Sequence, residues 1–177
     1  MAAKSSLLLW FFFLFLAGTV FAQGLVPLKL DPKNRAVFSL GYNFIPKGTK
    51  LGNREAEDGF FVPTVGFDYF RKLHARWEIG LMWDWELDHY FIKSEDLERE
   101  RAMIFTLVGN FKLTEKWAVF AGLGPELEEH RNQAVFRIGT EYAMVMGNNW
   151  KFVPALSCDL KNGYSTWSAS VGFGKFF

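Results

Sequence analysis

The chain has 177 residues, which is enough for one domain or at most two. Its 20 basic and 19 acidic side chains give a formal net charge of +1, so nothing in the composition indicates a nucleic-acid partner. The single cysteine, Cys158, excludes an internal disulfide framework.

The first 22 residues have the layout of a secretory signal peptide. Lys4 supplies a positive start, the apolar run LLLWFFFLFLA follows, and small or uncharged residues precede a predicted cleavage after Ala22. The run is shorter than the about 20 residues that a membrane-spanning helix needs, which disfavours a membrane anchor. Gln23, and not a cysteine, follows the predicted cut, which disfavours a lipoprotein. We expect a periplasmic N-terminal segment over 23–34 and a folded domain over 35–177.

Eight segments of the mature chain alternate between bulky apolar residues and small or polar ones. Such a period of two predicts strands whose two faces meet different surroundings. The clearest segment, 76–88, places tryptophan, isoleucine and leucine at odd positions and acidic residues, glycine and methionine at even ones. The eight segments are 36–45, 61–70, 76–88, 103–111, 117–127, 134–144, 150–160 and 167–177. The sequence therefore predicts an all-β fold of eight antiparallel strands.

The connections between these segments alternate in length. Long polar connections follow the first, third and fifth segments, whereas the short turns RKLHA, KLTEK and GNN follow the second, fourth and sixth. Short turns at one end and longer loops at the other are typical of outer-membrane barrels, of which eight strands is the smallest form. An even strand count also places both ends of the barrel chain at the short-turn, periplasmic side. The predicted topology is an up-and-down barrel.

The sizes of the side chains decide which face of the strands points outward. An eight-stranded barrel has an interior just wide enough for side chains to fill. The apolar faces carry tryptophan, phenylalanine and leucine, whereas the opposite faces carry many glycines, so we place the large side chains outside. A continuous apolar belt on the outside needs lipid. The alternative, a soluble lipocalin-like carrier with the faces reversed, would put the large side chains inside.

Aromatic residues mark the predicted membrane boundary. Trp77, Trp117 and Trp150 each open a strand after a short turn, and Phe177 lies at about the same level. Amphipathic rings favour the interface between lipid and water, so we predict these four residues as interface anchors. Pro63 and Pro154 fall within strand segments of a barrel that has no free edge, and we expect β-bulges at both.

The signal peptide, the eight segments and the terminal Phe177 resemble the small eight-stranded outer-membrane barrels, the OmpA-like and OmpX-like group, of diderm bacteria. The resemblance extends over the whole mature chain. It implies location in the outer membrane, contact with outer-membrane lipid and lipopolysaccharide, a monomer, and insertion by the barrel assembly machinery. In that group the last strand is a sorting signal with an aromatic last residue, which Phe177 matches. Lys175 departs from the apolar residue usual two places earlier, although a lysine there can snorkel to the interface.

Charged residues on the inward faces form the candidate site. An isolated charge in a narrow barrel is costly, so these side chains must pair or keep water. One interpretation is a structural network that fills the lumen, and the alternative is a small-conductance path or a binding site for a small polar solute. Acidic residues outnumber basic ones, so some carboxylates are expected to be protonated or to bind cations. The predicted lumen residues are Asp68, Glu78, Asp84, Glu86, Glu126, Arg137, Glu141, Lys151 and Asp159.

An enzyme that modifies envelope lipid is a further hypothesis, since small barrels that resemble lipid A palmitoyltransferases or deacylases use histidine with serine and an acid. His74, His89 and His130 are the histidines here, and none belongs to a His-x-Ser pair. His89 and His130 lie near acidic residues, but ligands from two loops are a weak metal signal. The sequence predicts no catalytic, cofactor or metal residue, and no cofactor.

The loop KSEDLERERA is either a helical turn after Ser94, or a solvated loop or strand extension, and it offers a surface for partners. We therefore predict a non-enzymatic barrel for envelope integrity or surface interaction.

Overall fold

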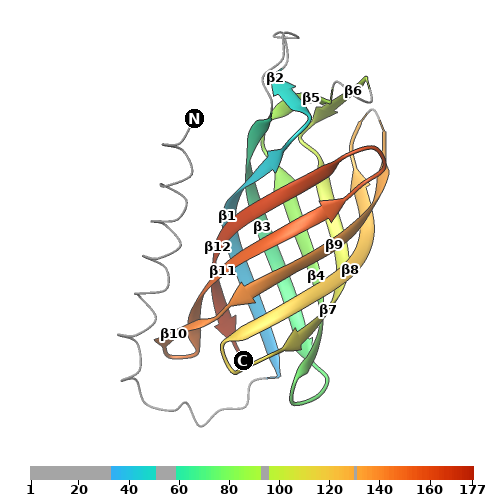
Figure 1. Ribbon diagram of the computed structural model, residues 1–177. Coiled ribbons are helices and arrows are strands. Elements are labelled where there is room, and N and C mark those ends of the chain that lie inside the picture. The colour runs from blue at the N-terminus through green and yellow to red at the C-terminus, as the bar shows by residue number, and fades with distance from the viewer. Residues whose placement is uncertain (1–32, 51–58, 93–95, 130) are drawn as a thin grey trace, which may run out of the picture. The chain divides into compact units, whose positions relative to one another are not determined.

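The computed structural model describes residues 33–50, 59–92, 96–129 and 131–177. Eight long strands form one closed antiparallel barrel, in which each strand pairs with the next and the last pairs with the first (Figure 1). The predicted all-β, eight-stranded, up-and-down barrel is confirmed. The predicted signal peptide and nearly all of 23–34 lie outside the described residues. The barrel strands are β1 (Asn34–Ile45), β3 (Phe60–Lys72), β4 (Trp77–Glu86), β7 (Met103–Lys112), β8 (Trp117–Leu127), β9 (Gln133–Tyr142), β11 (Trp150–Leu160) and β12 (Ser165–Phe176).

The barrel closes where β1 meets β12. The Asn34 N–H donates to the Phe177 carbonyl at 2.8 Å, and the Phe177 N–H donates back to the Asn34 carbonyl at 2.9 Å. Both residues therefore lie at the short-turn end, as the even strand count predicted. At the same end β10 (Met144–Gly147) and β11 form a hairpin whose turn residues, Asn148 and Asn149, have φ of 49° and 64°. Asparagine tolerates this left-handed conformation, which two-residue hairpin turns require.

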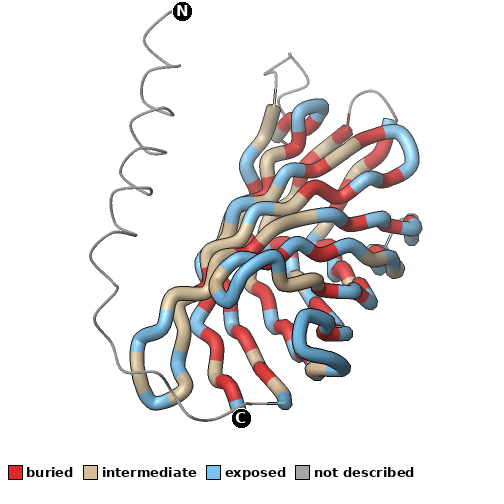
Figure 2. The backbone as a smooth tube through the Cα atoms, turned by 60° about the horizontal axis from the view of Figure 1, so that its bottom comes forward, coloured by how far each residue is buried: buried red, intermediate tan, exposed pale blue. Residues whose placement is uncertain are grey.

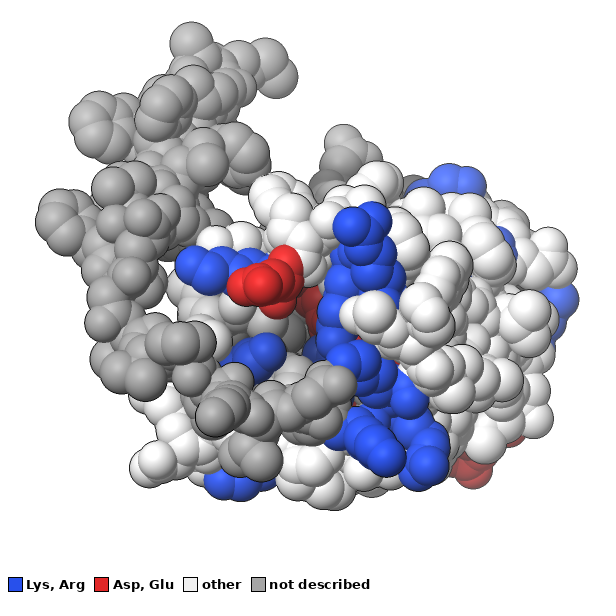
Figure 3. All heavy atoms as spheres, turned by 90° about the horizontal axis from the view of Figure 1, so that it is seen from below, with Lys and Arg blue, Asp and Glu red and all other residues white. Residues whose placement is uncertain are grey.

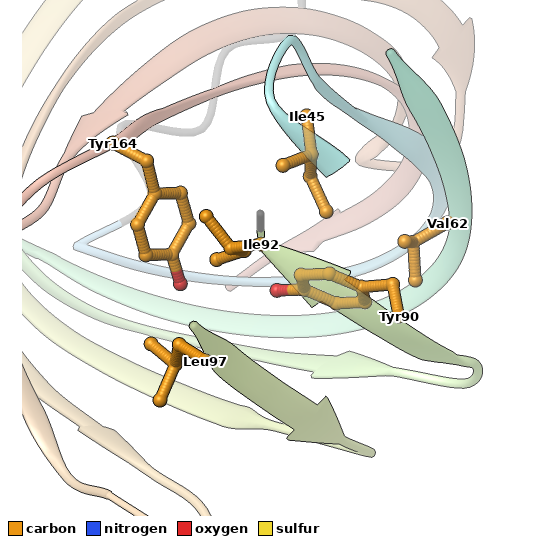
Figure 4. Close-up of a cluster of buried hydrophobic side chains, with 6 residues drawn as sticks. All are labelled: Ile45, Val62, Tyr90, Ile92, Leu97 and Tyr164. Atoms are coloured by element: carbon orange, nitrogen blue, oxygen red, sulfur yellow. The ribbon is translucent and has the colours of Figure 1, made fainter. Parts of the chain in front are cut away.

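The long connections carry a second sheet at the opposite end of the barrel. It consists of β2 (Gly48–Lys50), β5 (His89–Ile92) and β6 (Leu97–Glu100), in the order β2-β5-β6 (Figure 1). Of the alternatives for the loop KSEDLERERA, the strand extension is confirmed for the described part, because Leu97–Glu100 is a strand, whereas Ser94 and Glu95 lie outside the described residues. Apolar side chains pack beneath this sheet and form the apolar cap (Figure 4), which comprises Ile45, Val62, Tyr90, Ile92, Leu97 and Tyr164.

Burial alternates along most of the barrel strands, as the change of colour along the tube in Figure 2 shows, and least regularly along β11. The bulky apolar side chains point outward, for example Leu40 and Leu123, which are 52% and 68% exposed. Glycines face inward beside the few large inward residues. A Cβ atom on Gly80 would lie 2.2 Å from the Phe70 ring, and one on Gly139 would lie 2.4 Å from the Phe120 ring. The lumen has room for these rings only because the facing residues have no side chain, and the lipocalin-like alternative is wrong for this reason.

A group of apolar side chains lies inside the lumen beside these glycines. Phe70, Met82, Val108 and Phe120 come from four strands and pack together as one buried cluster. We refer to these four residues as the apolar layer.

No helix in the described part of the chain has the length and the apolar character to span a membrane.

The prolines do not produce the expected bulges in their own strands. Pro63 keeps the regular register of β3 with β1, and it lies one residue beyond the end of the β3–β4 ladder, where its carbonyl accepts from Leu87. Pro154 keeps the register of β11 with β12. On its other side β11 pairs with β9 and then with β10, and these two strands are interrupted at Ala143. Pro154, which has no N–H to donate, lies opposite this interruption in the pairing.

Candidate functional site in the barrel lumen

The lumen nearest the short turns holds an ionic cluster centred on Arg35 of β1. Its Nε donates to Glu78 Oε2 at 3.0 Å, and its two Nη atoms donate to Glu141 at 3.0 and 2.5 Å. Asn110 Nδ2 donates to both carboxylates at 3.0 Å, and Lys112 forms a second ion pair with Glu78. Arg35 is 3% exposed. The guanidinium therefore joins β4 to β9 across the interior, and it satisfies two buried acids at once.

Arg35 also connects this cluster to the apolar layer. Its Cζ lies 3.8 Å from the centroid of the Phe70 ring, which is cation–π geometry. Lys151, predicted as a member of the network, lies beside the cluster with its Nζ 4.0 Å from the centroid of the Phe176 ring. Beside Arg35, Lys151 and Phe176 a hollow of only about 20 Å³ remains. That volume has room for about one water molecule.

A second ionic cluster lies at the middle of the barrel and is centred on Arg137 of β9. Its Nε and Nη2 donate to the two oxygens of Asp159 at 2.6 and 2.7 Å, and its Nη1 donates to Asp84. Asp159 is the direct register partner of Arg137 on β11, whereas Asp84 reaches across from β4. Asp68 is also buried here, and its Oδ1 has no hydrogen-bond partner among the described residues.

A third ionic cluster lies beneath the apolar cap and holds Glu86 and Glu126. Lys161 Nζ lies 2.9 Å from Glu126 Oε2 and 3.9 Å from Glu86 Oε1. Arg99 of β6 pairs with Glu126 as well. Glu86 accepts from Asn43 Nδ2 at 2.8 Å and from the Tyr90 hydroxyl at 2.7 Å. The second sheet therefore contributes both an apolar cover and polar partners to the lumen.

Burial and charge shift the titration of the groups that cover this third cluster. Burial raises the pKa of Tyr164 to about 12 and raises the pKa of Tyr90 well above its ordinary value. Burial alone would lower the pKa of Lys161, but Glu126 and Glu86 outweigh it, so the pKa lies above its ordinary value. At neutral pH these groups remain a protonated ammonium and two neutral phenols.

All the predicted lumen residues lie on inward faces, but the prediction missed four basic side chains. They are Arg35, Arg99, Lys112 and Lys161, and each of them pairs with a predicted acid. These four side chains reduce the predicted excess of acid in the lumen, where seven acidic residues face six basic ones. Arg35 and Lys112 could have been found by extending the period-two alternation of their segments by one residue. Lys161 could have been found in the same way, since it continues the odd, inward positions of segment 150–160 by one residue, whereas Arg99 had no such signal.

The histidines do not assemble into one site within the described residues. His74 lies in the turn between β3 and β4, at the short-turn end. His89 lies in β5 at the opposite end, with its Nε2 2.9 Å from Glu100 Oε1. His130 lies outside the described residues. In the described ranges, no three residues from His, Cys, Asp and Glu are arranged to hold a metal ion.

The predicted interface anchors share one level on the outer wall. Trp77, Trp117 and Trp150 are the first residues of β4, β8 and β11, and Phe177 follows β12. All four side chains are about half exposed. The Trp117 Nε1–H donates to Thr140 Oγ1 at 2.5 Å, which fixes the orientation of its indole. The geometry is that of an aromatic girdle, and its anchoring role remains a prediction.

No protein-family model matches the sequence, and no curated protein matches it. Among solved structures, the chain is similar to Ail, the attachment invasion locus protein of Yersinia pestis, with a TM-score of 0.52, 12% identity, and coverage of 82% of this chain and 99% of Ail. A second Ail structure, in complex with the heparin analogue sucrose octasulfate, gives a TM-score of 0.50 at 11% identity over the same shares. Neisserial surface protein A gives 0.49 at 6% identity, over 81% of this chain and 97% of that one.

Ail is an outer membrane protein. The fold is that of a small outer-membrane β-barrel. The predicted resemblance to this group is confirmed at the level of the fold. An outer-membrane β-barrel presents its apolar wall to lipid, and the exposed tryptophans, phenylalanines and leucines of this barrel require the same surroundings. The fold and the wall together support the predicted outer-membrane location.

Proposed function

We propose that this outer-membrane β-barrel is a non-enzymatic, non-conducting protein that serves envelope integrity or surface interaction. The observation that carries the proposal is the filling of the lumen. Three ionic clusters, centred on Arg35, Arg137 and Glu126, lie in succession along the barrel, and the apolar layer packs against the first of them. Buried ion pairs of this kind resist separation, because removing one partner leaves an uncompensated charge.

The apolar layer narrows the lumen for a permeating ion. Phe70 and Phe120 occupy the width that Gly80 and Gly139 leave free, and Arg35 covers the Phe70 ring from the short-turn side. At the other end the apolar cap covers the third cluster. A solute would have to displace packed rings and break buried ion pairs at several levels. The energetic cost of these steps supports a closed barrel.

The loop end of the barrel supports a role in surface interaction. Among the described residues this end is rich in acid: Asp88, Asp96, Glu98, Glu100, Glu128 and Glu129 lie there together with the basic Lys47, Arg101 and Arg131. Acidic loops favour contact with anionic head groups through bridging cations. We propose lipopolysaccharide and outer-membrane lipid as the partners of the folded protein, the barrel assembly machinery as its partner during insertion, and a monomer as its state.

A small-conductance path, or a binding site for a small polar solute, is the second candidate. The observation in its favour is the set of buried polar groups near the middle cluster without hydrogen-bond partners among the described residues, which includes Asp68 Oδ1, Thr106 Oγ1 and Ser168 Oγ. A polar solute would satisfy such groups. This candidate requires the apolar layer to open.

Conductance in planar bilayers separates the two candidates. We expect the wild-type protein to give no steps, and the double variant Phe70→Ala/Phe120→Ala to give small cation-dependent steps, because it removes the rings that fill the apolar layer. Wild-type steps as large as those of the variant would overturn the proposal and favour the second candidate.

Mass spectrometry of lipid A from expressing cells tests the enzyme hypothesis, and a changed mass would contradict a non-enzymatic role.

A further inference from the structure

The lipid-facing wall of the barrel has a hollow near the short-turn end. Its volume is about 420 Å³, and it lies over β4, β7 and β8. Gly109 of β7 forms its floor, with Ile79 of β4 and Ala121 of β8 as its direct register partners. Leu107 and Leu123 border it on the loop side, and Trp77 borders it on the short-turn side. We refer to this feature as the wall hollow.

The wall hollow exists because two small residues face outward in a wall of large ones. A Cβ atom on Gly109 would meet only the Ala121 carbonyl oxygen, at 4.0 Å, so the glycine is not required by close packing. The inward glycines Gly80 and Gly139 differ, since rings occupy the space beside them. An unfilled hollow in an apolar wall forfeits dispersion contacts with the surrounding chains. An inserted hydrocarbon chain would restore those contacts.

Unpaired basic side chains lie beside the wall hollow. Arg71 is on the outward face of β3 and is the register partner of Ile79, whereas Arg76 is in the turn before β4. Leu73, which lies between them in sequence, lines the hollow. Within the described ranges, neither the Arg71 nor the Arg76 side chain has a hydrogen-bond or ion-pair partner. Figure 3, which views the short-turn end, shows lysine and arginine side chains gathered in a band across this face.

We propose that the wall hollow binds one phospholipid whose head group carries a phosphate and a net negative charge. One acyl chain lies over Gly109 and Ala121, between Trp77 and Leu123, and the phosphate accepts from Arg71 and Arg76. An arginine guanidinium donates two parallel hydrogen bonds to a phosphate, and it does so best where water is partly excluded. The boundary between head groups and acyl chains supplies both the charge and the hydrocarbon that this site requires.

A second copy of the chain fits the same surface less well. Oligomers of one chain are most often two-fold symmetric, so the same patch would meet itself. Such a contact would bring Arg71 and Arg76 of one copy close to the same residues of the other, and like charges in a membrane wall repel each other strongly. An anionic lipid has the complementary charge. Charge complementarity therefore favours the lipid as the occupant.

Native mass spectrometry of the full chain in a mild detergent tests the proposal. The protein is titrated with phosphatidylglycerol and, separately, with zwitterionic phosphatidylcholine. We expect one tightly retained phosphatidylglycerol and weaker retention of phosphatidylcholine. Gly109→Leu fills the hollow, and Arg71→Gln/Arg76→Gln removes the two guanidinium groups that donate hydrogen bonds to the phosphate. Each variant should lower the retained fraction of phosphatidylglycerol at least about tenfold, which corresponds to about 1.4 kcal/mol of binding free energy.

Matched controls lie elsewhere on the same barrel. Ala169→Leu enlarges an outward small residue of β12, and Arg101→Gln removes an exposed arginine at the loop end; both variants should retain the lipid as the wild type does. Each variant is first checked for its fold by gel migration without boiling. Ala121→Leu, which fills the hollow from β8, replaces Gly109→Leu if that variant misfolds. Equal retention in wild type and filled variants, or a dimer mass in place of the lipid adduct, would overturn the proposal.

Discussion

Arg137 and Asp159 face each other directly across the β9–β11 pair and form two parallel hydrogen bonds, at 2.6 and 2.7 Å, inside the barrel. Arg137 is 2% exposed and Asp159 is fully buried. Because the same guanidinium also pairs with Asp84, one cation holds two anions from opposite parts of the wall. The pair is therefore a cross-link of the interior as well as a local neutralisation of charge.

Arg137→Met should destabilise the barrel by about 3–5 kcal/mol, because it leaves Asp84 and Asp159 buried without a cation. The measurement is unfolding in urea, followed by gel migration without boiling. The triple variant Arg137→Met/Asp84→Asn/Asp159→Asn should recover more than half of the loss, since neutral side chains need no counter-ion. Arg101→Met, which changes an exposed arginine at the loop end, is the control and should unfold like the wild type. An Arg137→Met protein that unfolds at the wild-type urea concentration would show that the cluster adds no stability.

Gly80→Ala should cost about 1–3 kcal/mol of stability, because the added methyl group would lie 2.2 Å from the Phe70 ring and would force it to move. Gly109→Ala is a matched control on the next strand, where the added group would meet only a carbonyl oxygen at 4.0 Å. The same urea titration compares the two. Gly80→Ala/Phe70→Leu should be closer to the wild type than Gly80→Ala alone. An equal cost at both glycines would contradict the packing argument.

Alkaline pH should loosen the apolar cap. Since the folded-state pKa of Tyr164, about 12, lies above its ordinary value of 10, its contribution to stability is complete below pH 10 and is lost as the pH rises to about 12. Each pH unit in that window costs about 1.4 kcal/mol. The pKa values of Tyr90 and Lys161 are also raised, so they act in the same direction. Tyrosinate absorbance and urea unfolding across this range measure the effect.

Tyr164→Phe is the control for this pH dependence. A phenylalanine has no proton to lose, so the variant should keep more of its stability between pH 10 and 12 than the wild type does. Below pH 10 it should differ little, since the Tyr164 hydroxyl makes one long hydrogen bond, 3.4 Å to Glu126. A wild-type protein whose stability is flat across this window would contradict the burial of the phenol.

The sequence was sufficient to predict the barrel because one physical constraint recurs along it. Residues at alternate positions meet lipid or a narrow lumen, so size and polarity alternate with period two from Phe38 to Phe173. The inward acids follow the same rule. The exposure pattern of the strands repeats this alternation, which is why both the strand count and the faces could be predicted from the amino-acid sequence.

The partners of those acids could not be predicted in full. Arg99 lies in a short strand of a separate sheet and folds back into the barrel mouth, where no alternation extends. Its position depends on the pairing of β5 with β6 and on the packing of the apolar cap, which are contacts between segments distant in sequence. The interruption opposite Pro154 was also not predicted. A proline in β11 lacks a hydrogen-bond donor, but the sequence does not show on which of the two neighbouring strands the pairing is interrupted.

Phe177→Ala should lower the amount of folded protein in the outer membrane while leaving the folded barrel stable. The side chain is exposed on the outer wall, whereas the backbone of Phe177 makes the hydrogen bonds that close the barrel to Asn34, and alanine keeps these. Immunodetection in the urea-washed outer-membrane fraction, on gels with and without boiling, measures assembly. Phe173→Ala, also an exposed phenylalanine of β12, is the control and should assemble normally. Equal yields of the two variants would contradict a sorting role for the last residue.

The pairing of β1 with β12 also determines when the barrel can close. These two strands are the first and the last of the barrel in the chain, so their hydrogen bonds join the most distant parts of the sequence. Until β12 has been made and delivered, β1 keeps an unpaired edge, and every partial sheet has two such edges that can aggregate. Closure therefore requires the last strand, and a chain released before β12 is complete keeps both edges of its sheet exposed.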